Sequence, residues 1–485
     1  MSTNSKKVLG NRFTLPHPLP LFDIAATRGI ECIHAASPDS ESLMQRAGIA
    51  VAKLTIALAP HARLIWIPCG PGNNGGDGLE AALHLHRMGK QVLVSELPSA
   101  QPRVGDALKA HQRAVQAGVV FQAYLPVGFD FCVDALFGIG KSGDFDPLCR
   151  TWIAQINAST GPVLSVDMPT GLQADTGVAA NHAVQADFTL SLLTLKPGLF
   201  TADGRAFSGD IWFNALDTAH TELPAAYLGG TPQKEHRPHN THKGSFGDVA
   251  VIGGDTGMVG AALLAARAAL RGGSGRVFVG LLAHEAPALD HNLPELMVRN
   301  ARSLPIESMA VVAGCGGGLA LAAYLLDVVQ RSKYLVLDAD ALNHLALSQQ
   351  AQRELASRAY GTTVLTPHPL EAARLLATSA SDVQANRIAA AQSLADRSQC
   401  VVVLKGSGSV VAAPGRLPYI NPTGNAHLAT AGTGDVLAGL IGSYLAQHHE
   451  AFSASCAAVY RHGKVADLWP ASAGALTAHQ LAQAL

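Results

Sequence analysis

The sequence predicts an α/β protein of two domains, each built on a doubly wound parallel sheet. Short apolar runs alternate with helical patterns in both halves of the chain, and the 485 residues suffice for two to four domains. The alternation lapses once, in a stretch of proline, glycine and mixed polar residues near residue 230. We expect a first domain over residues 1–225, a linker over 226–240 and a larger second domain over 241–485.

In the first half, five apolar runs have the length of buried strands, namely residues 64–67, 91–94, 129–134, 163–167 and 188–193. Helical patterns lie between them, as at residues 79–88 and 106–117. Strands separated by helices of this length form right-handed βαβ units, so we expect a parallel sheet with helices on both faces.

The second half repeats this alternation. Its strand-like runs are residues 249–252, 277–279, 310–313, 334–337, 363–365 and 401–404, and its clearest helical patterns are residues 261–270 and 436–446. The glycine loops of the two halves differ in spacing and order, so the halves are not an internal repeat.

The composition of the chain limits the kinds of molecule that the protein is expected to bind. The chain is 48% hydrophobic and 15% charged, and 35 Lys and Arg residues nearly balance 36 Asp and Glu residues. Without a long basic run or a long apolar segment, neither a nucleic-acid surface nor a membrane span is expected. We read the first twenty residues as a disordered start, not a signal peptide. Seven cysteines without a C-x-x-C pair indicate no disulfide framework or zinc site and suit a reducing cytoplasm. The composition leaves room for a homo-oligomer.

The segment from Cys69 to Gly78 carries five glycines between an apolar run and a helical pattern. Glycines allow φ > 0 and let backbone N–H groups approach an anion, and a following helix N-terminus adds positive potential. This pattern predicts a loop that holds an anionic ligand. The alternative is a tight βα turn without a ligand.

Polar residues follow three of the predicted strands, where a parallel sheet gathers its ligands. The oxygen donors Asn74, Asp134 and Thr170 carry one formal negative charge between them, which suits a monovalent cation better than Mg²⁺ or zinc. Asp134 and Asp167 could instead cap local turns.

Four segments in the same order, residues 70–78, 133–138, 166–171 and 195–198, resemble the NAD(P)H-hydrate epimerases, which implies a Rossmann-like first domain. The resemblance implies that Asn74, Asp134 and Thr170 bind K⁺, with Thr170 where serine is commoner. It also implies that Asp167 is the acid and base at the nicotinamide ring and that Lys196 assists it. The residues implied to bind the hydrated dinucleotide are Asn73, Asn74, Gly75, Gly76, Asp77, Gly138, Ile139, Gly140, Lys141, Ser142, Gly143, Asp144 and Asp167.

In the second half, Gly432-Thr433-Gly434-Asp435 directly precedes a helical pattern. Backbone amides and the helix dipole there would form an anion hole beside a carboxylate, as phosphoryl transfer requires. The alternative is a glycine turn with Asp435 as an ordinary first-turn acid. A lysine and glycine-rich turn at residues 403–409 suits nucleotide phosphates.

These motifs resemble the ribokinase-like superfamily. Residues 242–247, 257–261, 366–369 and 424–425, together with 432–435, resemble the NAD(P)H-hydrate dehydratases within it. The resemblance implies that Asp435 activates the hydrate hydroxyl for attack on ADP, with Mg²⁺ as the metal. It implies a dinucleotide pocket of Ala261, Gly316, His368 and Asp435 and a nucleotide site of Lys405, Gly406, Ser407, Gly408, Ser409 and Gly434.

Two positions depart from the dehydratase pattern. Leu370 stands where glycine is common, and Cys315 stands where proline is common between two glycines. Leu370 could alter a turn that needs glycine. Neither change removes a group from the expected chemistry.

The hypothesis that unites both halves is a bifunctional repair enzyme. It would epimerise hydrated NADH and NADPH (NADHX and NADPHX) and dehydrate the S epimer with ADP. One alternative is a small-molecule kinase with a dinucleotide-sensing domain. The other is a first half that serves only as a binding module.

Overall fold

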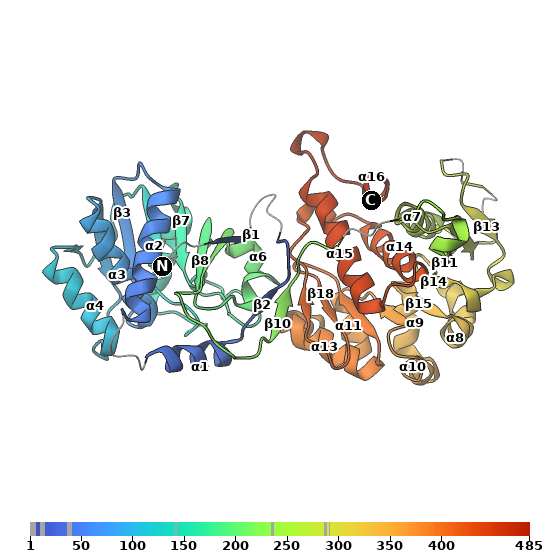
Figure 1. The fold of residues 1–485 in the computed structure, drawn as a ribbon, viewed down its shortest axis with the longest axis horizontal. Coiled ribbons are helices and arrows are strands. Elements are labelled where there is room, and N and C mark those ends of the chain that lie inside the picture. The colour runs from blue at the N-terminus through green and yellow to red at the C-terminus, as the bar shows by residue number, and fades with distance from the viewer. Residues whose placement is uncertain are drawn as a thin grey trace. The chain divides into compact units, whose positions relative to one another are not determined.

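The computed structural model describes residues 6–9, 15–35, 41–140, 143–233, 237–285, 289–290 and 292–485. Backbone contacts divide the chain into two compact units (Figure 1). Unit 1 holds Leu19–Ala226 with the N-terminal segment Met1–Leu15, and unit 2 holds Tyr227–Leu485 with Pro16–Pro18.

The sheet of unit 1 has the strand order β1-β9-β8-β7-β6-β3-β4-β5. Its strands run parallel except at the edge, where β1 is antiparallel to β9. The strands are β1 (Lys6–Leu9), β3 (Leu64–Cys69), β4 (Gln91–Glu96), β5 (Val120–Phe121), β6 (Phe131–Asp134), β7 (Val163–Val166), β8 (Phe188–Leu192) and β9 (Asp210–Asn214), and the short β2 (Leu19–Leu21) precedes the first helix. The helices are α1 (Ile24–Ala35), α2 (Leu43–Leu58), α3 (Asn73–Arg87), α4 (Gly105–Gln116), α5 (Pro147–Ala158) and α6 (Gly204–Phe207).

Alternating side chains of the strands build a core on each face of this sheet. Ile65 and Ile67 pack in one cluster with α2, α3 and α4, while Trp66 packs in another with Trp152 of α5. Helices on both faces confirm the predicted doubly wound architecture. The predicted disordered start was wrong for Lys6–Leu9, which pairs with β9 at the sheet edge. That pairing is non-local, so the local sequence could not reveal it.

In unit 2 the strands follow the order β13-β12-β11-β14-β15-β16-β17-β18-β19-β10. The pairs β17-β18 and β18-β19 are antiparallel and the other pairs are parallel. The strands are β10 (Ala226–Leu228), β11 (Asp248–Gly253), β12 (Arg276–Leu281), β13 (Met297–Arg299), β14 (Ala310–Ala313), β15 (Tyr334–Leu337), β16 (Thr363–Leu365), β17 (Val401–Leu404), β18 (Val410–Ala412) and β19 (Tyr419–Ile420). β10 lies inside the span that the sequence predicts to be a linker.

Ten α-helices of unit 2 are described: α7 (Val259–Arg271), α8 (Ala322–Arg331), α9 (Asp340–Leu347), α10 (Gln349–Ala356), α11 (Pro369–Leu376), α12 (Ala380–Ala385), α13 (Arg387–Ser398), α14 (Thr433–Ala446), α15 (Ala451–Asp467) and α16 (Ala478–Ala484). Val249 and Val251 of β11 pack with α7, α14 and α15, whereas Ala250 and Ile252 face the cluster of α8, α9, α10, α11 and α13. Unit 2 is therefore also an α/β sandwich with a central sheet.

The glycine-rich segment of unit 1 differs from its predicted conformation. Helix α3 begins at Asn73, so the expected loop residues from Asn73 to Gly78 form its first turns. None of the five glycines has positive φ. They are needed for close packing instead, because a Cβ on Gly75 would lie 1.9 Å from the Gly70 carbonyl oxygen and one on Gly78 would lie 2.4 Å from Ala135 Cβ.

This packing predicts a stability difference between two glycines of the segment. Gly75→Ala would overpack backbone against backbone, at a cost of about 1–3 kcal/mol or more. We expect the melting transition of unit 1 to fall by about 4 °C or more in thermal unfolding. Gly72→Ala is the matched control, because a Cβ there meets nothing within 4 Å. Equal melting temperatures for the two variants would contradict the packing argument.

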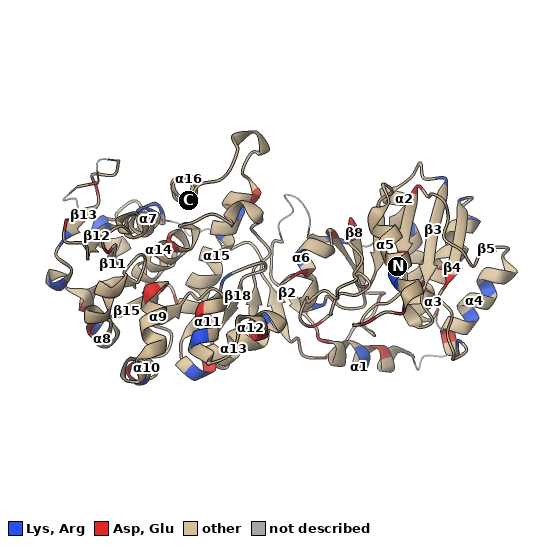
Figure 2. Cartoon of the chain, turned by 180° about the vertical axis from the view of Figure 1, so that it is seen from behind, with Lys and Arg blue, Asp and Glu red and all other residues tan. Residues whose placement is uncertain are grey.

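Charged side chains are distributed over both units. Figure 2 shows acidic and basic residues interspersed along the helices of each unit. Within the described ranges, no helix has both the length and the apolar character that crossing a bilayer requires.

Candidate active sites

The first candidate site lies at the carboxyl ends of the strands of unit 1. Asp134, at the end of β6, is fully buried, and its Oδ1 accepts the Thr170 hydroxyl at 2.7 Å. Its Oδ2 accepts the Ser165 hydroxyl at 2.8 Å and the Thr170 N–H at 3.0 Å. Burial raises the pKa of Asp134, while these hydrogen bonds lower it. The predicted residues Asp134 and Thr170 are thus brought together, with Ser165 as a partner that the sequence did not single out.

Asp167 follows β7 with a left-handed backbone, φ 65°. A non-glycine residue in this region costs about 1–3 kcal/mol and is held there by its surroundings. Its Oδ1 accepts from the Leu192 N–H at 3.1 Å and from the ammonium of Lys196. Lys196 is almost wholly buried and also donates to the carbonyls of Leu192 at 2.7 Å and Thr194 at 3.0 Å. The proposed acid/base residue and its helper therefore form a buried ion pair.

Asn74 joins this site from the first turn of α3. A Cβ on Gly138 would lie 3.0 Å from Asn74 Oδ1 and 3.4 Å from Asp167 Oδ2, so these groups surround Gly138. The buried Nδ2 of Asn74 has no hydrogen-bond partner. An unpartnered buried amide is costly and indicates a group that a ligand would satisfy.

Two further carboxyl groups lie near Asp167. Burial and the charge of Asp167 raise the pKa of Asp77 well above its ordinary value, and they also raise that of Glu31. Asp77 was predicted to contact substrate, whereas Glu31 on α1 was not predicted. An acid preceding the glycine segment by forty residues gives no local signal of proximity to it.

The expected substrate loop after β6 is described only in part. Ile139, Gly140, Gly143 and Asp144 are described, and the Asp144 carboxylate pairs with Arg150 at 3.8 Å near the surface. Lys141 and Ser142 lie outside the described residues.

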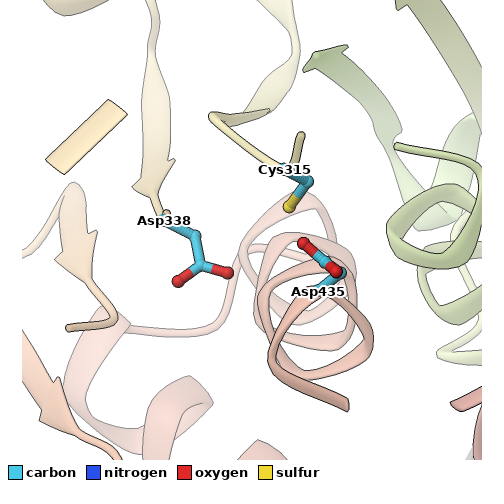
Figure 3. Close-up of side chains that lie close together, drawn as sticks. All are labelled: Cys315, Asp338 and Asp435. Carbon is cyan, nitrogen blue, oxygen red and sulfur yellow. The ribbon is translucent and has the colours of Figure 1, made fainter. Parts of the chain in front are cut away.

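The second candidate site is centred on Asp435 in the first turn of α14. The N-cap of this helix is Gly432 in left-handed conformation, φ 90°, with no side-chain cap on the helix amides. Figure 3 shows Asp435 beside Cys315 and Asp338, and one ligand atom of each lies within 4.8 Å of the others. Burial and the nearby Asp338 raise the pKa of Asp435 to about 7, while Cys315 and Lys405 oppose the rise. The carboxyl group can therefore gain and lose a proton near neutrality.

Lys405 connects Asp435 to the nucleotide-type loop. Its ammonium donates to Asp338 Oδ1 at 2.6 Å and lies 3.3 Å from the position of a Cβ on Gly434. Burial disfavours the charged lysine, but Asp338 and Glu371 raise its pKa. At Gly406, with φ 137°, a Cβ would lie 2.9 Å from the guanidinium of Arg387, which bonds the Leu404 and Lys405 carbonyls. The structure thus brings Lys405, Gly406 and Gly434 together.

Two of the expected pocket residues, Ala261 and Gly316, lie close to one another. A Cβ on Gly316 would meet Ala261 Cβ at 2.9 Å. His368 caps α11, accepting the Leu370 N–H at 3.1 Å through Nδ1. The concern over Leu370 was wrong, because this residue lies within α11 and has no positive φ.

Comparisons with known proteins match most of the chain. A model described as NAD(P)H-hydrate dehydratase matches residues 249–485, and one described as YjeF-related protein N-terminus matches residues 40–198. The bifunctional NAD(P)H-hydrate repair enzyme of Coxiella burnetii is 35% identical over 92% of this chain and 94% of its own length. That of Escherichia coli is 34% identical over 96% of this chain and 92% of its own length.

The chain belongs to the family of bifunctional NAD(P)H-hydrate repair enzymes. It is therefore an enzyme that joins an epimerase to a dehydratase. A solved structure of an ADP/ATP-dependent NAD(P)H-hydrate dehydratase from Bacillus subtilis is 33% identical and covers 52% of this chain and 91% of that chain, with a TM-score of 0.44.

The dehydratase half contains three residues at its site that sequence reasoning missed. Asp338 follows β15, so an acid directly after a predicted strand could have indicated it. Glu371 accepts the His368 N–H at 2.8 Å, and burial raises its pKa to about 7. His462 contacts the Thr433 carbonyl at 2.9 Å through Nε2, and burial lowers its pKa to about 4, so it is neutral. No local pattern distinguishes His462 from other helical histidines.

Proposed function

We propose that unit 1 interconverts the R and S hydrates of NADH and NADPH, and that unit 2 dehydrates the S hydrate with ADP, yielding AMP and phosphate. The observation that carries the proposal is the placement of Asp435. Its carboxyl group has a pKa of about 7 and lies in the first turn of an uncapped helix, beside Lys405 and Gly434. A base and an anion site are thereby combined in one turn.

In the dehydratase site, Asp435 accepts the proton of the hydrate hydroxyl as its oxygen attacks the β-phosphorus of ADP. AMP leaves, and the amides at the start of α14 stabilise the transferred group. Phosphate then departs with the former hydroxyl oxygen, and loss of a ring proton restores the nicotinamide double bond. Lys405 neutralises phosphate charge. The remaining members of the proposed nucleotide site are Gly406, Ser407, Gly408, Ser409 and Gly434, and those of the dinucleotide pocket are Ala261, Gly316 and His368.

Mg²⁺ is expected to reach this site on the phosphates of ADP. Its preference for phosphate oxygens and several retained waters favours that complex. There it would neutralise charge on the phosphoryl group in transit.

In the epimerase site, Asp167 moves the proton that must leave and return when the hydrated ring changes configuration. The Lys196 ammonium fixes one carboxylate oxygen, Oδ1. Oδ2 faces the space around Gly138 and Asn74, where the hydrated ring would lie. The first turn of α3 has no side-chain cap, so its amides are placed to bind the dinucleotide phosphates.

A K⁺ ion fits the polar groups beside this site. The Thr170 hydroxyl lies 2.7 Å from Asp134 Oδ1 and 3.2 Å from the Phe137 carbonyl oxygen, donating to both, and the amide oxygen of Asn74 lies beside Gly138. One carboxylate among neutral oxygens suits a monovalent cation. Bound K⁺ would hold the loops after β6 and β7 together, and its charge would favour binding of the dinucleotide phosphates.

The K⁺ assignment predicts that the Thr170 hydroxyl is required and its methyl group is not. We expect Thr170→Val to slow epimerisation by about tenfold or more and to abolish its dependence on K⁺, because the oxygen ligand and the bond to Asp134 are lost. Thr170→Ser retains the hydroxyl and should keep both. Epimerisation rates measured in KCl and in tetramethylammonium chloride provide the comparison. A K⁺ response that survives in the valine variant would refute the assignment.

The proposed function is tested by following the absorbance of reduced nicotinamide with purified R and S hydrates. ADP-dependent recovery of both epimers above the spontaneous rate supports both activities. Recovery of the S hydrate alone would leave unit 1 a binding module. Recovery of neither would favour the kinase alternative.

The cysteines bear on the cellular location of the protein. All seven are free, which supports our proposal of a reducing, cytoplasmic location.

A further inference from the structure

The surroundings of Asp435 contain a group that the proposed reaction does not use, the thiol of Cys315. Cys315 follows β14, Asp338 follows β15 and Asp435 lies in the first turn of α14, so three separate elements converge (Figure 3). The sulfur and one carboxylate oxygen of each aspartate lie within 4.8 Å of one another. Cys315 and Asp338 are buried, and Asp435 is partly exposed.

These distances suit a small thiophilic cation. The ligand atoms of a tetrahedral zinc site lie about 3–4 Å apart, because each is about 2.0–2.3 Å from the metal. Small side-chain rotations would close the three atoms to that spacing. A thiolate with two carboxylates is a donor set for Zn²⁺ or its softer congener Cd²⁺, whereas Mg²⁺ and K⁺ avoid sulfur.

The charges around the cluster also leave room for a cation. The Lys405 ammonium and the Thr366 hydroxyl both donate to Oδ1 of Asp338, at 2.6 Å and 2.8 Å. Oδ2 of Asp338 accepts from neither of them. The carboxylates of Asp338 and Asp340 both lie close enough to Asp435 to repel its negative charge. A divalent cation would relieve this repulsion.

We propose that Cys315 Sγ and the carboxylates of Asp338 and Asp435 bind a thiophilic divalent cation, Zn²⁺ or Cd²⁺, which inhibits dehydration. Binding breaks the S–H bond, forms a sulfur–metal bond and releases one proton to solvent. The fourth metal position is left for water. Inhibition follows because the Asp435 oxygen that should accept the substrate proton is occupied by the metal. The inhibition rests on the proposed function, whereas the binding does not.

The binding is tested by titrating the full-length protein with CdCl₂ and recording the ultraviolet cadmium–thiolate charge-transfer absorbance. The wild type should show one saturable equivalent that Cys315→Ala lacks. Asp338→Asn should weaken this binding by about tenfold or more, since a ligand is lost. Cys32→Ala removes an exposed thiol and should leave the Cys315-dependent equivalent unchanged. Identical titrations of the wild type and Cys315→Ala would overturn the proposal.

The inhibition is measured with the same variants. Cd²⁺ or Zn²⁺ at the concentration that saturates the band should stop ADP-dependent dehydration in the wild type. The Cys315→Ala variant should remain active at that concentration, and its inhibition should require at least about tenfold more metal. Epimerisation serves as the internal control and should not respond. A saturated band with undiminished dehydration would overturn the inhibitory role. Absence of dehydration before metal is added would instead count against the proposed function, while the absorbance still decides the binding.

Discussion

Asp435→Asn is expected to lower ADP-dependent dehydration by about 10²–10⁴-fold, because asparagine cannot accept the hydroxyl proton. Epimerisation should persist, since Asp167 and its partners belong to unit 1. The measurement is recovery of reduced nicotinamide from the purified S hydrate, with R-to-S conversion followed separately. Loss of both activities in a folded variant would contradict separate sites.

The pH dependence of the same reaction gives a second test of this residue. As a base, Asp435 must be ionised, and its pKa is about 7. Dehydration should therefore rise with pH through about 7 in the wild type, and the residual activity of Asp435→Asn should lack this limb. Asp340→Asn is the matched control, because it removes a negative charge close to Asp435 without changing Asp435 itself. The Asp340 carboxylate accepts the Gly318 N–H at 2.9 Å, and asparagine retains an oxygen for that bond. The Asp340→Asn variant should remain active, and its dehydration rate should begin to rise at a lower pH than in the wild type, because loss of this charge lowers the pKa of Asp435.

Stability provides a check that the inactive variant is folded. The pKa of Asp435 is raised in the folded state from an ordinary 3.8, so the folded protein binds the proton more tightly than the unfolded chain. Stability from this group therefore falls as pH rises from about 4 to about 7. Asp435→Asn should accordingly unfold at a higher temperature than the wild type at pH values above 7, and the difference should shrink in acid. A melting temperature of Asp435→Asn below that of the wild type at alkaline pH would contradict the burial of the Asp435 carboxylate.

Asp167→Asn is expected to reduce epimerisation by about 10²–10⁴-fold while leaving dehydration of the S hydrate intact. Asparagine retains an oxygen for Lys196, and that ammonium keeps the Leu192 and Thr194 carbonyls as acceptors. The buried Lys196 ammonium loses its counter-ion, however, so unit 1 is expected to unfold at a lower temperature, and epimerisation is measured below that transition. The measurement is the rate at which a purified R hydrate becomes a substrate for the dehydratase half.

Asp187→Asn is the matched control for this variant. Its carboxylate accepts the Val163 N–H at 2.8 Å, at the opposite end of β7 from Asp167. This variant removes the same charge from unit 1, beside the first residue of β7, but should leave epimerisation within about threefold of the wild type. If both variants lose epimerisation equally, Asp167 acts through stability and not through proton transfer.

The Lys196→Met variant distinguishes the contribution of Lys196 from that of the proposed base, Asp167. The lysine is buried against Asp167, and removing one partner of a buried ion pair costs about 3–5 kcal/mol. Destabilisation of unit 1 is therefore expected in thermal unfolding, with dehydration retained below the transition. A melting temperature like that of the wild type would show that the pair contributes little to the fold.

The sequence predicted the positions of strands closely where each strand is an unbroken run of apolar residues. Residues 310–313, 334–337, 363–365 and 401–404 coincide with β14, β15, β16 and β17, because fully buried parallel strands appear as unbroken apolar runs. The short strands β5, β10 and β19 escaped prediction, since two or three residues acquire strand structure only through their neighbours.

By itself the sequence determined the two-unit α/β architecture, the family and the motifs around Asp167 and Asp435, because each depends on residues adjacent in the chain. Only the tertiary structure decided the glycine conformations of α3, the Asp167–Lys196 ion pair and the convergence of Cys315, Asp338 and Lys405 on Asp435. These features depend on contacts between strand ends and helices far apart in the sequence. Burial at those contacts then set the pKa of Asp435, which no residue pattern specifies.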